Sequence, residues 1–302
     1  FQLVCKCFVF VFFFNDYPLR YSMTVTYSEY FGLLNILSCV LAQENLPWDQ
    51  FARGSSYIAA SYVKYLEAAG ARVVDTIPLK HLLAYLSKLW LLRLLLPGGD
   101  VDLQTSQFSR AAKIFYNLAL KGNDAGDYFP IWGTCQGFQQ LTVLTANKNL
   151  LTLTDTKAVA LPLTLTSVAP SSRLFRNFPK DLLRSLASEN ITANFHSWSL
   201  SIRNAKLRRF YKILSTNSDG KKEFISTMEA NHYPFYAVQW HPEKSPFEWV
   251  DKPGMIHSVS AVRASFYTAS FFVSEGNTKS VQSKSSLWVN KKPVAGNLPQ
   301  KF

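Results

Sequence analysis

Short apolar runs alternate with amphipathic segments along most of this chain. The run at residues 36–42 (ILSCVLA) is short and almost wholly apolar, which is typical of strands buried on both faces of a parallel sheet. Residues 71–74 and 89–96 are further strand-like runs, each with one arginine. Between the first two runs, residues 57–69 (YIAASYVKYLEAA) place apolar side chains on one helical stripe. The pattern predicts an α/β fold with a doubly wound, mostly parallel sheet flanked by helices.

The first predicted helix carries signals at both ends. Ser55 or Ser56 can cap its N-terminus, and Gly70 is a typical C-terminal stop before the next strand. The resulting βαβ unit is expected to have a right-handed crossover. Periodicity further predicts helices at 108–119, 137–145 and 261–275, strands at 129–132 and 236–240, and shorter strand-like pieces between residues 150 and 240.

The two ends of the chain differ from its middle. Residues 1–14 (FQLVCKCFVFVFFF) form an apolar block that is too short to span a bilayer and resembles the core of a secretory leader. We therefore expect residues 1–34 to be a leader remnant or another segment that is not part of the domain. Residues 35–275 would then form one catalytic domain, and the Ser-, Lys- and Asn-rich residues 276–302 a flexible tail.

A second apolar stretch, residues 82–96 (LLAYLSKLWLLRLLL), is interrupted by charge. It contains Lys88 and Arg93 and stops at Pro97, so it predicts a helix leading into a buried strand and no membrane span. The sequon at Asn190 is compatible with the secretory route, although a single sequon is also expected by chance.

Composition narrows the function classes. The formal charge of +12 comes from 32 Lys and Arg against 20 Asp and Glu, but the basic residues are scattered and do not alternate with aromatics as in a nucleic-acid groove. We therefore expect no nucleic-acid partner. The four cysteines form no CxxC pair, and no His-x-x-His segment accompanies them. Neither a structural zinc site nor a disulfide scaffold is expected.

Three predicted strands end in chemically interesting residues, namely Gly98–Gly99, Cys135 and His241. In a doubly wound sheet, ligands bind outside the carboxyl ends of the strands. The segment GTCQG around Cys135 has the build of a nucleophile elbow, where a helix N-terminus lowers the pKa of a thiol. Alone, this pattern is equally compatible with a buried structural cysteine at a tight turn.

The segment HPE supplies a partner for such a cysteine. His241 can act at the same edge of the sheet, and Glu243 can orient its imidazole and stabilise the imidazolium form. Taken by itself, a His-Pro-Glu turn is more often structural. The two motifs together favour a catalytic pair.

At this point the chain resembles the gamma-glutamyl hydrolases, which belong to the class I glutamine amidotransferase-like (flavodoxin-like) proteins. The matching stretches are YIAASYVKYLEAAGARVV (57–74), LPGGDVDL (96–103), AAKIFYNLAL (111–120), DYFPIWGTCQGF (127–138), NFHSWSLS (194–201), EFISTMEA (223–230) and YPFYAVQWHPEKSPFEW (233–249). The resemblance implies a cysteine hydrolase that cuts γ-glutamyl bonds in folate and antifolate poly-γ-glutamates. It also implies a homodimer that acts in lysosomes or after secretion.

The resemblance implies roles for individual residues as well. Cys135 would be the nucleophile, His241 the general base and then acid, and Glu243 the residue that orients it. His196, in NFHSWS, would be a substrate-binding residue, although its local sequence fits a packed core histidine equally well.

The expected mechanism needs donors for the oxyanion that forms when the thiolate attacks the amide carbonyl. The backbone N–H groups of Gly99 and Gln136 are the expected oxyanion hole. Gly98 would allow close approach and contribute to substrate binding. We expect no metal and no organic cofactor.

The chain departs from the usual GTCLGFEE pattern of this family. It has Gln136, Gln139 and Gln140, so two carboxylates beside the cysteine are missing. Two alternatives therefore stay open. One is a glutaminase-type amidotransferase domain, and the other is a diverged, non-catalytic homologue that binds γ-glutamyl ligands without cutting them.

Overall fold

The computed structural model describes residues 37–50, 52–75, 93–202 and 205–275. In these ranges the largest sheet has eight strands in the order β4-β1-β5-β6-β12-β11-β10-β8. The first five strands run parallel to one another. They are β4 (Arg72–Asp75), β1 (Leu37–Val40), β5 (Arg93–Leu96), β6 (Ile131–Thr134) and β12 (Phe235–Val238).

The other side of the sheet is antiparallel. Strand β12 pairs with β11 (Glu223–Ala230), which pairs with β10 (Tyr211–Ser218), which in turn pairs with β8 (Thr164–Leu165). Most of the pairings are nevertheless parallel, so the predicted fold class is confirmed.

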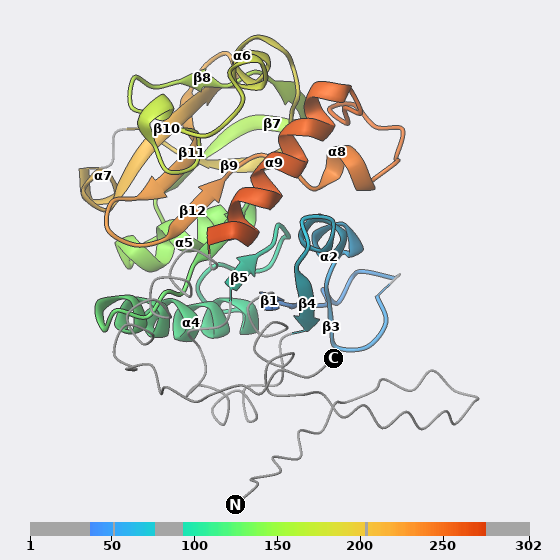
Figure 1. Cartoon of the computed structure of the whole chain (residues 1–302). Helices are drawn as coiled ribbons and strands as arrows, with labels where there is room; N and C mark the ends of the chain where they lie inside the picture. The colour runs from blue at the N-terminus through green and yellow to red at the C-terminus, as the bar shows by residue number, and fades with distance from the viewer. Residues whose placement is uncertain (1–36, 51, 76–92, 203–204, 276–302) are drawn as a thin grey trace, which may run out of the picture.

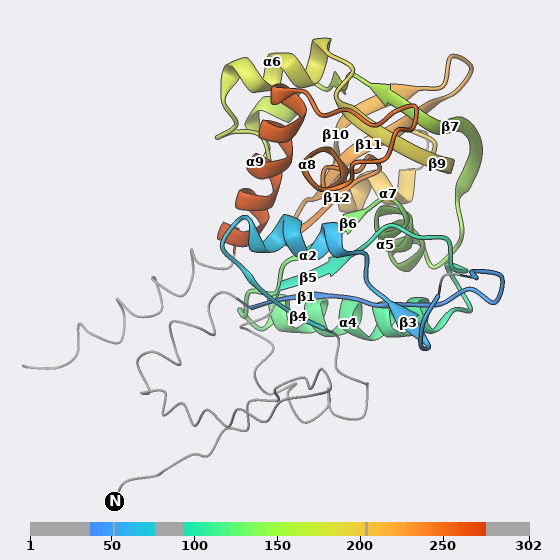
Figure 2. The ribbon, with the colours of Figure 1, turned by 90° about the vertical axis from the view of Figure 1, so that its right-hand side faces the viewer.

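Helices cover both faces of this sheet (Figures 1 and 2). Helices α2 (Ala60–Glu67) and α9 (Val259–Glu275) contribute to one apolar core, and α4 (Gln107–Asp124) and α5 (Gln136–Ala146) contribute to the other. The central strands β5, β6 and β12 are buried along their whole length, as expected where both faces are covered. The other helices of the described ranges are η2 (Ala169–Ser171), α6 (Lys180–Ser188), α7 (Ala205–Phe210) and α8 (Lys244–Phe247).

Two small sheets lie beside the main one. Strand β7 (Leu151–Leu161) pairs antiparallel with β9 (Thr192–Leu200), and β2 (Gln43–Glu44) pairs antiparallel with β3 (Ser56–Tyr57). The backbone N–H of His241 donates to the carbonyl of Ala193 at 2.9 Å. This bond attaches the β7–β9 sheet to the segment that follows β12.

One helix start was predicted wrongly. Ser56 pairs within β3 and does not cap a helix, and α2 begins at Ala60, behind Ala59, without a side-chain cap. The pairing with β2 keeps residues 56–57 extended, so the helix begins three residues later than expected. At the other end of α2 the prediction is confirmed, because Gly70 has a φ of +89° and ends the helical segment.

Other predicted element boundaries differ less from the observed ones. Strand β6 lies two residues later than the predicted strand at 129–132, and β7 is an eleven-residue strand where only short pieces were expected. The leader-like residues 1–34, the helix expected within residues 82–92 and the tail 276–302 lie outside the described residues. None of the helices in the described ranges has the length and hydropathy of a membrane span.

Candidate active site

Three neighbouring strands bring the sequence-predicted residues to one edge of the sheet. Strands β5, β6 and β12 are adjacent, and their carboxyl ends lead to Gly98, Cys135 and His241. A Cβ atom at Gly98 would lie 2.7 Å from Cε1 of His241 and 3.3 Å from Cβ of Cys135. Only a glycine therefore fits between the cysteine and the histidine.

Cys135 has a strained backbone. Its φ of 51° and ψ of −104° lie outside the regions that residues with a side chain prefer. The turn also needs its glycines, because a Cβ at Gly133 would lie 2.6 Å from the Gly137 carbonyl oxygen, and one at Gly137 would lie 2.0 Å from that of Leu96. Helix α5 begins at the next residue, so the thiol sits at a helix N-terminus.

His241 and Glu243 form a buried pair. The Nδ1 atom of His241 lies 2.6 Å from Oε1 of Glu243. Burial alone would lower the pKa of His241, but the charges of Glu243 and Cys135, with hydrogen bonds to both, raise that pKa to about 10. Burial opposes ionisation of Glu243, and the charge and hydrogen bond of His241 hold its pKa below the usual value. The imidazole is therefore charged at neutral pH.

Tyr62 is a site residue that the sequence did not reveal. Its hydroxyl oxygen accepts a hydrogen bond from the Gly98 N–H at 2.7 Å and lies 3.4 Å from Nδ1 of His241. Burial, followed by the charges of Glu243 and Cys135, raises the pKa of Tyr62 well above its usual value. The helical periodicity placed Tyr62 on the apolar stripe, but nothing in the pattern indicated what its hydroxyl would meet.

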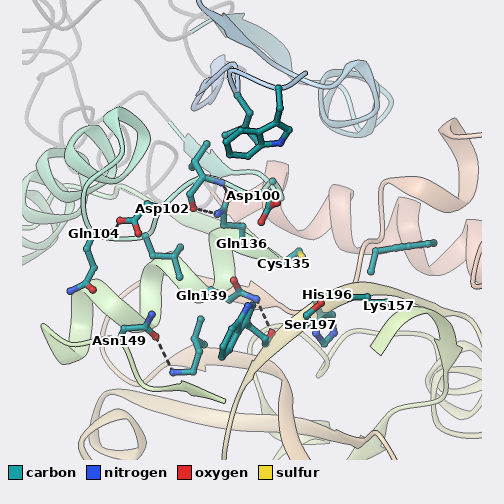
Figure 3. A pocket seen from close by; sticks show the side chains of 18 of the residues that line it. Asp100, Asp102, Gln104, Cys135, Gln136, Gln139, Asn149, Lys157, His196 and Ser197 are labelled. Carbon is teal, nitrogen blue, oxygen red and sulfur yellow. Dashed lines mark hydrogen bonds between the residues drawn. The ribbon is translucent and has the colours of Figure 1, made fainter. Parts of the chain in front are cut away.

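The side chain of Gln136 ties the elbow to the loop after β5 (Figure 3). Its Nε2 donates to the Val101 carbonyl, and its Oε1 accepts from the Val101 N–H at 3.3 Å. Oε1 also accepts from Nε2 of Gln43 at 2.8 Å, and the Gln43 amide occupies the space that a Cβ at Gly99 would need. The loop that carries both Gly98 and Gly99 is thereby attached to α5.

Gln139 and Gln140, the other two glutamines that depart from the family pattern, also act as hydrogen-bond donors. Nε2 of Gln139 donates to the Trp198 carbonyl at 2.8 Å, and Nε2 of Gln140 lies 3.2 Å from the Leu103 carbonyl and from Oγ of Ser109. An ionised carboxylate accepts hydrogen bonds but donates none. In this chain, the amides therefore make bonds to carbonyl oxygens that glutamates could not make.

His196 lies on β9 and lines a cavity that also contains Cys135 in its wall (Figure 3). Its Nε2 lies 3.2 Å from Oδ1 of Asn194, and its Nδ1 lies 2.9 Å from Oγ1 of Thr156 and 3.1 Å from Oγ of Ser199. Burial and the charge of His241 lower the pKa of His196 to about 3, against a hydrogen bond with the Trp198 backbone. It is therefore a neutral, fully bonded histidine.

A cavity of about 910 Å³ opens in front of Cys135. Its lining includes Gly99, Gln136 and His196, together with the cations Lys157 and Lys252 and the exposed Trp48 and Trp198. The last four were not predicted, because an isolated lysine or tryptophan in the sequence gives no signal of a site. In the described ranges, no three His, Cys, Asp or Glu side chains are grouped to hold a metal ion.

The fold and the site define the class of protein first. A cysteine on a strained elbow, beside a histidine–carboxylate pair at the carboxyl edge of a mostly parallel sheet, is the arrangement of an α/β enzyme with a nucleophilic thiol. The chain belongs to the Peptidase C26 family, whose sequence model matches residues 33–243.

Curated relatives agree with this family. The gamma-glutamyl hydrolase of Rattus norvegicus is 56% identical over 230 residues, which cover 74% of this chain and 72% of that protein. The gamma-glutamyl hydrolase of Homo sapiens is 52% identical over 240 residues, covering 77% and 74%. Gamma-glutamyl hydrolase 1 of Arabidopsis thaliana is 35% identical over 228 residues, covering 73% and 65%.

Solved structures with a similar arrangement are more distant. The structure of PurLQS from Thermotoga maritima has a TM-score of 0.46 and 18% identity, covering 76% of this chain and 96% of that one. A glutamine amidotransferase from the same organism has a TM-score of 0.39 and 11% identity, covering 83% and 86%. Likenesses at this distance have no bearing on the substrate.

Proposed function

We propose that this chain hydrolyses γ-glutamyl bonds through a thioester on Cys135. The observation that carries the proposal is the packing at Gly98, where an added Cβ would touch both the histidine and the cysteine. Membership of the Peptidase C26 family and the gamma-glutamyl hydrolase relatives support the bond type.

The resting site would hold a thiolate and an imidazolium. The raised pKa of His241, about 10, keeps a proton on the ring at neutral pH. In the first step, the Cys135 thiolate would attack the side-chain carbonyl of a γ-linked glutamate, and a C–S bond would form. The resulting oxyanion would accept hydrogen bonds from the N–H groups of Gly99 and Gln136, the latter being the first residue of α5 with no acceptor in its own helix.

The same imidazole would serve both halves of the reaction. His241 would donate its proton to the leaving amine as the C–N bond breaks, leaving an acyl thioester and a neutral ring. The ring would then take a proton from water, whose oxygen attacks the thioester. Breaking of the C–S bond would release the γ-carboxylic acid, which loses its proton to water, and restore the thiolate–imidazolium pair, with Glu243 holding the ring orientation throughout.

The substrate would be a folate poly-γ-glutamate. Its γ-linked chain carries one free carboxylate per residue, and Lys157 and Lys252 line the cavity in positions to attract them. Trp48, 74% exposed, and Trp198, 51% exposed, line the same cavity and offer aromatic faces to the aryl end of a folate. His196 would lie beside the substrate as a neutral ring, with its two nitrogen atoms bonded to Asn194, Thr156 and Ser199.

The test is release of glutamate or short γ-glutamyl peptides from a folate polyglutamate under mildly acidic conditions, with Cys135→Ala as the matched variant. We expect cleavage by the natural chain and none by the variant. Cleavage by neither, with binding by both, would instead identify a non-catalytic binding protein. Hydrolysis of free glutamine in preference to the polyglutamate would identify a glutaminase-type domain.

We also propose a secretory route and a homodimer. Asn190, the sequon residue, is exposed between α6 and β9. Expression through a secretory pathway should therefore give a mass shift that glycosidase treatment removes and that Asn190→Gln lacks. Light scattering on the purified chain should give twice the monomer mass, and a monomer mass would refute the dimer.

A further inference from the structure

We propose that Tyr62 is a positioning residue that couples the loop carrying Gly98 and Gly99 to the His241–Glu243 pair. This inference rests on the proposed function, because it assigns a role within the same reaction. Tyr62 itself would touch no reacting atom. It would act through the Gly98 peptide on one side and through the histidine–carboxylate pair on the other.

The first contact fixes the loop. Tyr62 oxygen accepts the Gly98 N–H at 2.7 Å, which is a short and well-formed hydrogen bond. Gly98 directly precedes Gly99, whose N–H is a proposed oxyanion donor. A Cβ at Gly98 would also lie 2.7 Å from this hydroxyl, so the phenol defines how closely the loop approaches His241.

The second contact concerns the hydroxyl proton. Since the Tyr62 oxygen accepts from Gly98, its own hydrogen needs an acceptor on the other side. Nδ1 of His241, at 3.4 Å, already shares a proton with Oε1 of Glu243 at 2.6 Å. The other oxygen of Glu243, Oε2, is buried and has no hydrogen-bond partner among the described residues. The carboxylate charge therefore attracts the phenol hydrogen toward the pair.

The position of Tyr62 on its helix makes the contact rigid. The residue lies in α2, is 4% exposed and packs in the apolar core that α2 shares with α9. A buried aromatic ring anchored in a helix holds its hydroxyl with little freedom of movement. Misplacement of a reacting group by about 1 Å costs on the order of a hundredfold in rate, so a rigid support of this kind affects catalysis.

The same helix supplies a matched control. Tyr65 is also buried, at 1% exposed, and its hydroxyl donates to Oγ1 of Thr268 at 3.0 Å. That bond joins α2 to α9, and neither of its two residues lines the cavity. Tyr62→Phe and Tyr65→Phe therefore remove the same atom from the same helix, but only the first removes it from the site.

The experiment measures kcat, KM, the pH–rate profile and the thermal midpoint of the natural chain and both variants on one γ-glutamyl substrate. Reactive Cys135 is titrated with a thiol reagent, so that kcat refers to folded sites. For Tyr62→Phe we expect kcat to fall about tenfold or more and KM to stay within about twofold. The alkaline limb of the pH–rate profile should shift, because the His241–Glu243 pair loses the neighbouring Tyr62 hydroxyl. For Tyr65→Phe we expect a lower thermal midpoint and an unchanged kcat.

The outcomes separate this inference from the function on which it rests. If the natural chain does not cleave, the proposed function fails. If it cleaves and Tyr62→Phe matches it in kcat and pH profile, the positioning role is refuted. Equal losses of kcat in both variants would also refute it, because the effect would then be structural. Should Tyr62→Phe fold poorly, Tyr62→Trp with the same titration of reactive Cys135 replaces it, and an unchanged kcat per reactive thiol again refutes the role.

Discussion

Two buried histidines, His241 and His196, have the same exposed fraction and different charge states. His241, after β12, and His196, in β9, are each 6% exposed. The pKa of His241 is raised to about 10, whereas that of His196 is lowered to about 3. The difference lies in their partners, which are a carboxylate at 2.6 Å for His241 and neutral hydroxyl and amide groups for His196.

The comparison teaches that burial does not set the charge of a histidine by itself. Removal from water disfavours the imidazolium at both positions. Only nearby negative charge reverses that preference, and Glu243 and Cys135 provide it at His241 alone. The site thus has a charged ring beside the thiol and a neutral ring at His196, where a second cation would be repelled by the first.

The largest expected effect comes from making the surroundings of His241 neutral. Glu243→Gln keeps the shape of the partner but removes its charge, so the pKa of His241 should fall and the thiolate–imidazolium pair should be lost. We expect kcat to fall about a thousandfold, by analogy with carboxylates that orient a catalytic histidine elsewhere. Steady-state kinetics across pH would check it.

A neighbouring acid provides the control for that variant. Glu248 pairs with Lys244 at 2.5 Å and accepts from Oγ of Ser61, but is partly exposed. Glu248→Gln should leave kcat within about threefold, because a partly exposed pair contributes little. A Glu243→Gln variant as active as Glu248→Gln would contradict our account of the two histidines.

A smaller effect is expected from placing a methyl group beside His241, the charged histidine. Gly98→Ala would place a methyl group 2.7 Å from both the His241 ring and the Tyr62 hydroxyl, and the ring would have to move from Cys135. We expect kcat to fall about a hundredfold. Gly122→Ala, whose added methyl would meet its nearest atom at 3.8 Å, should be active, and equal activity of the two variants would show that the site tolerates displacement.

The pH dependence of stability sharpens the comparison, because the two histidines act with opposite sign. As pH falls below 6.5, the unfolded chain binds a proton at position 196 that the folded chain does not, since the folded pKa is about 3. The free energy of unfolding should therefore fall by about 1.4 kcal/mol per pH unit. His241, with a folded pKa of about 10, stabilises fully below 6.5, and its contribution is lost as pH rises from 6.5 to 10.

Denaturant unfolding over a pH series would measure both slopes. His196→Gln should flatten the curve between pH 6.5 and 4.5, where the natural chain loses stability. His241→Gln should flatten it between pH 7 and 9 instead. Identical pH curves for the natural chain and His196→Gln would mean that folding does not lower the pKa of His196, and would contradict our account of this residue.

The smallest effect is expected from removing the side-chain bonds of Gln136, which attach the loop after β5 to α5. Gln136→Leu removes both bonds to Val101 and the bond to Gln43, but leaves the backbone N–H of residue 136 in place. We expect a loss in kcat of less than tenfold and a lower thermal midpoint. Gln136→Glu, which can accept but not donate, should be less stable than Gln136→Leu, because its carboxylate would face the Val101 carbonyl. The reverse order would show that the amide makes no useful bond.

Much of the site was predictable because its chemistry is local. The glycines on either side of Cys135 are needed within one turn, and Glu243 reaches His241 across only two residues. Apolar runs marked the central strands, and strand ends in a parallel sheet meet at one edge. The helix start predicted at Ser55 or Ser56 was wrong because strand pairing with residues 43–44 overrode a local capping signal.

The sequence by itself therefore determined the layered fold and the elbow, and it indicated the histidine–carboxylate pair. Only the tertiary structure decided that Tyr62 meets Gly98 across 36 positions, that Gln43 meets Gln136 across 93, and that His196 is neutral. The physical reason is that periodicity specifies which face of an element is buried. Which polar atoms meet on that face, and hence the pKa of each group, depends on distances between segments that are remote along the chain.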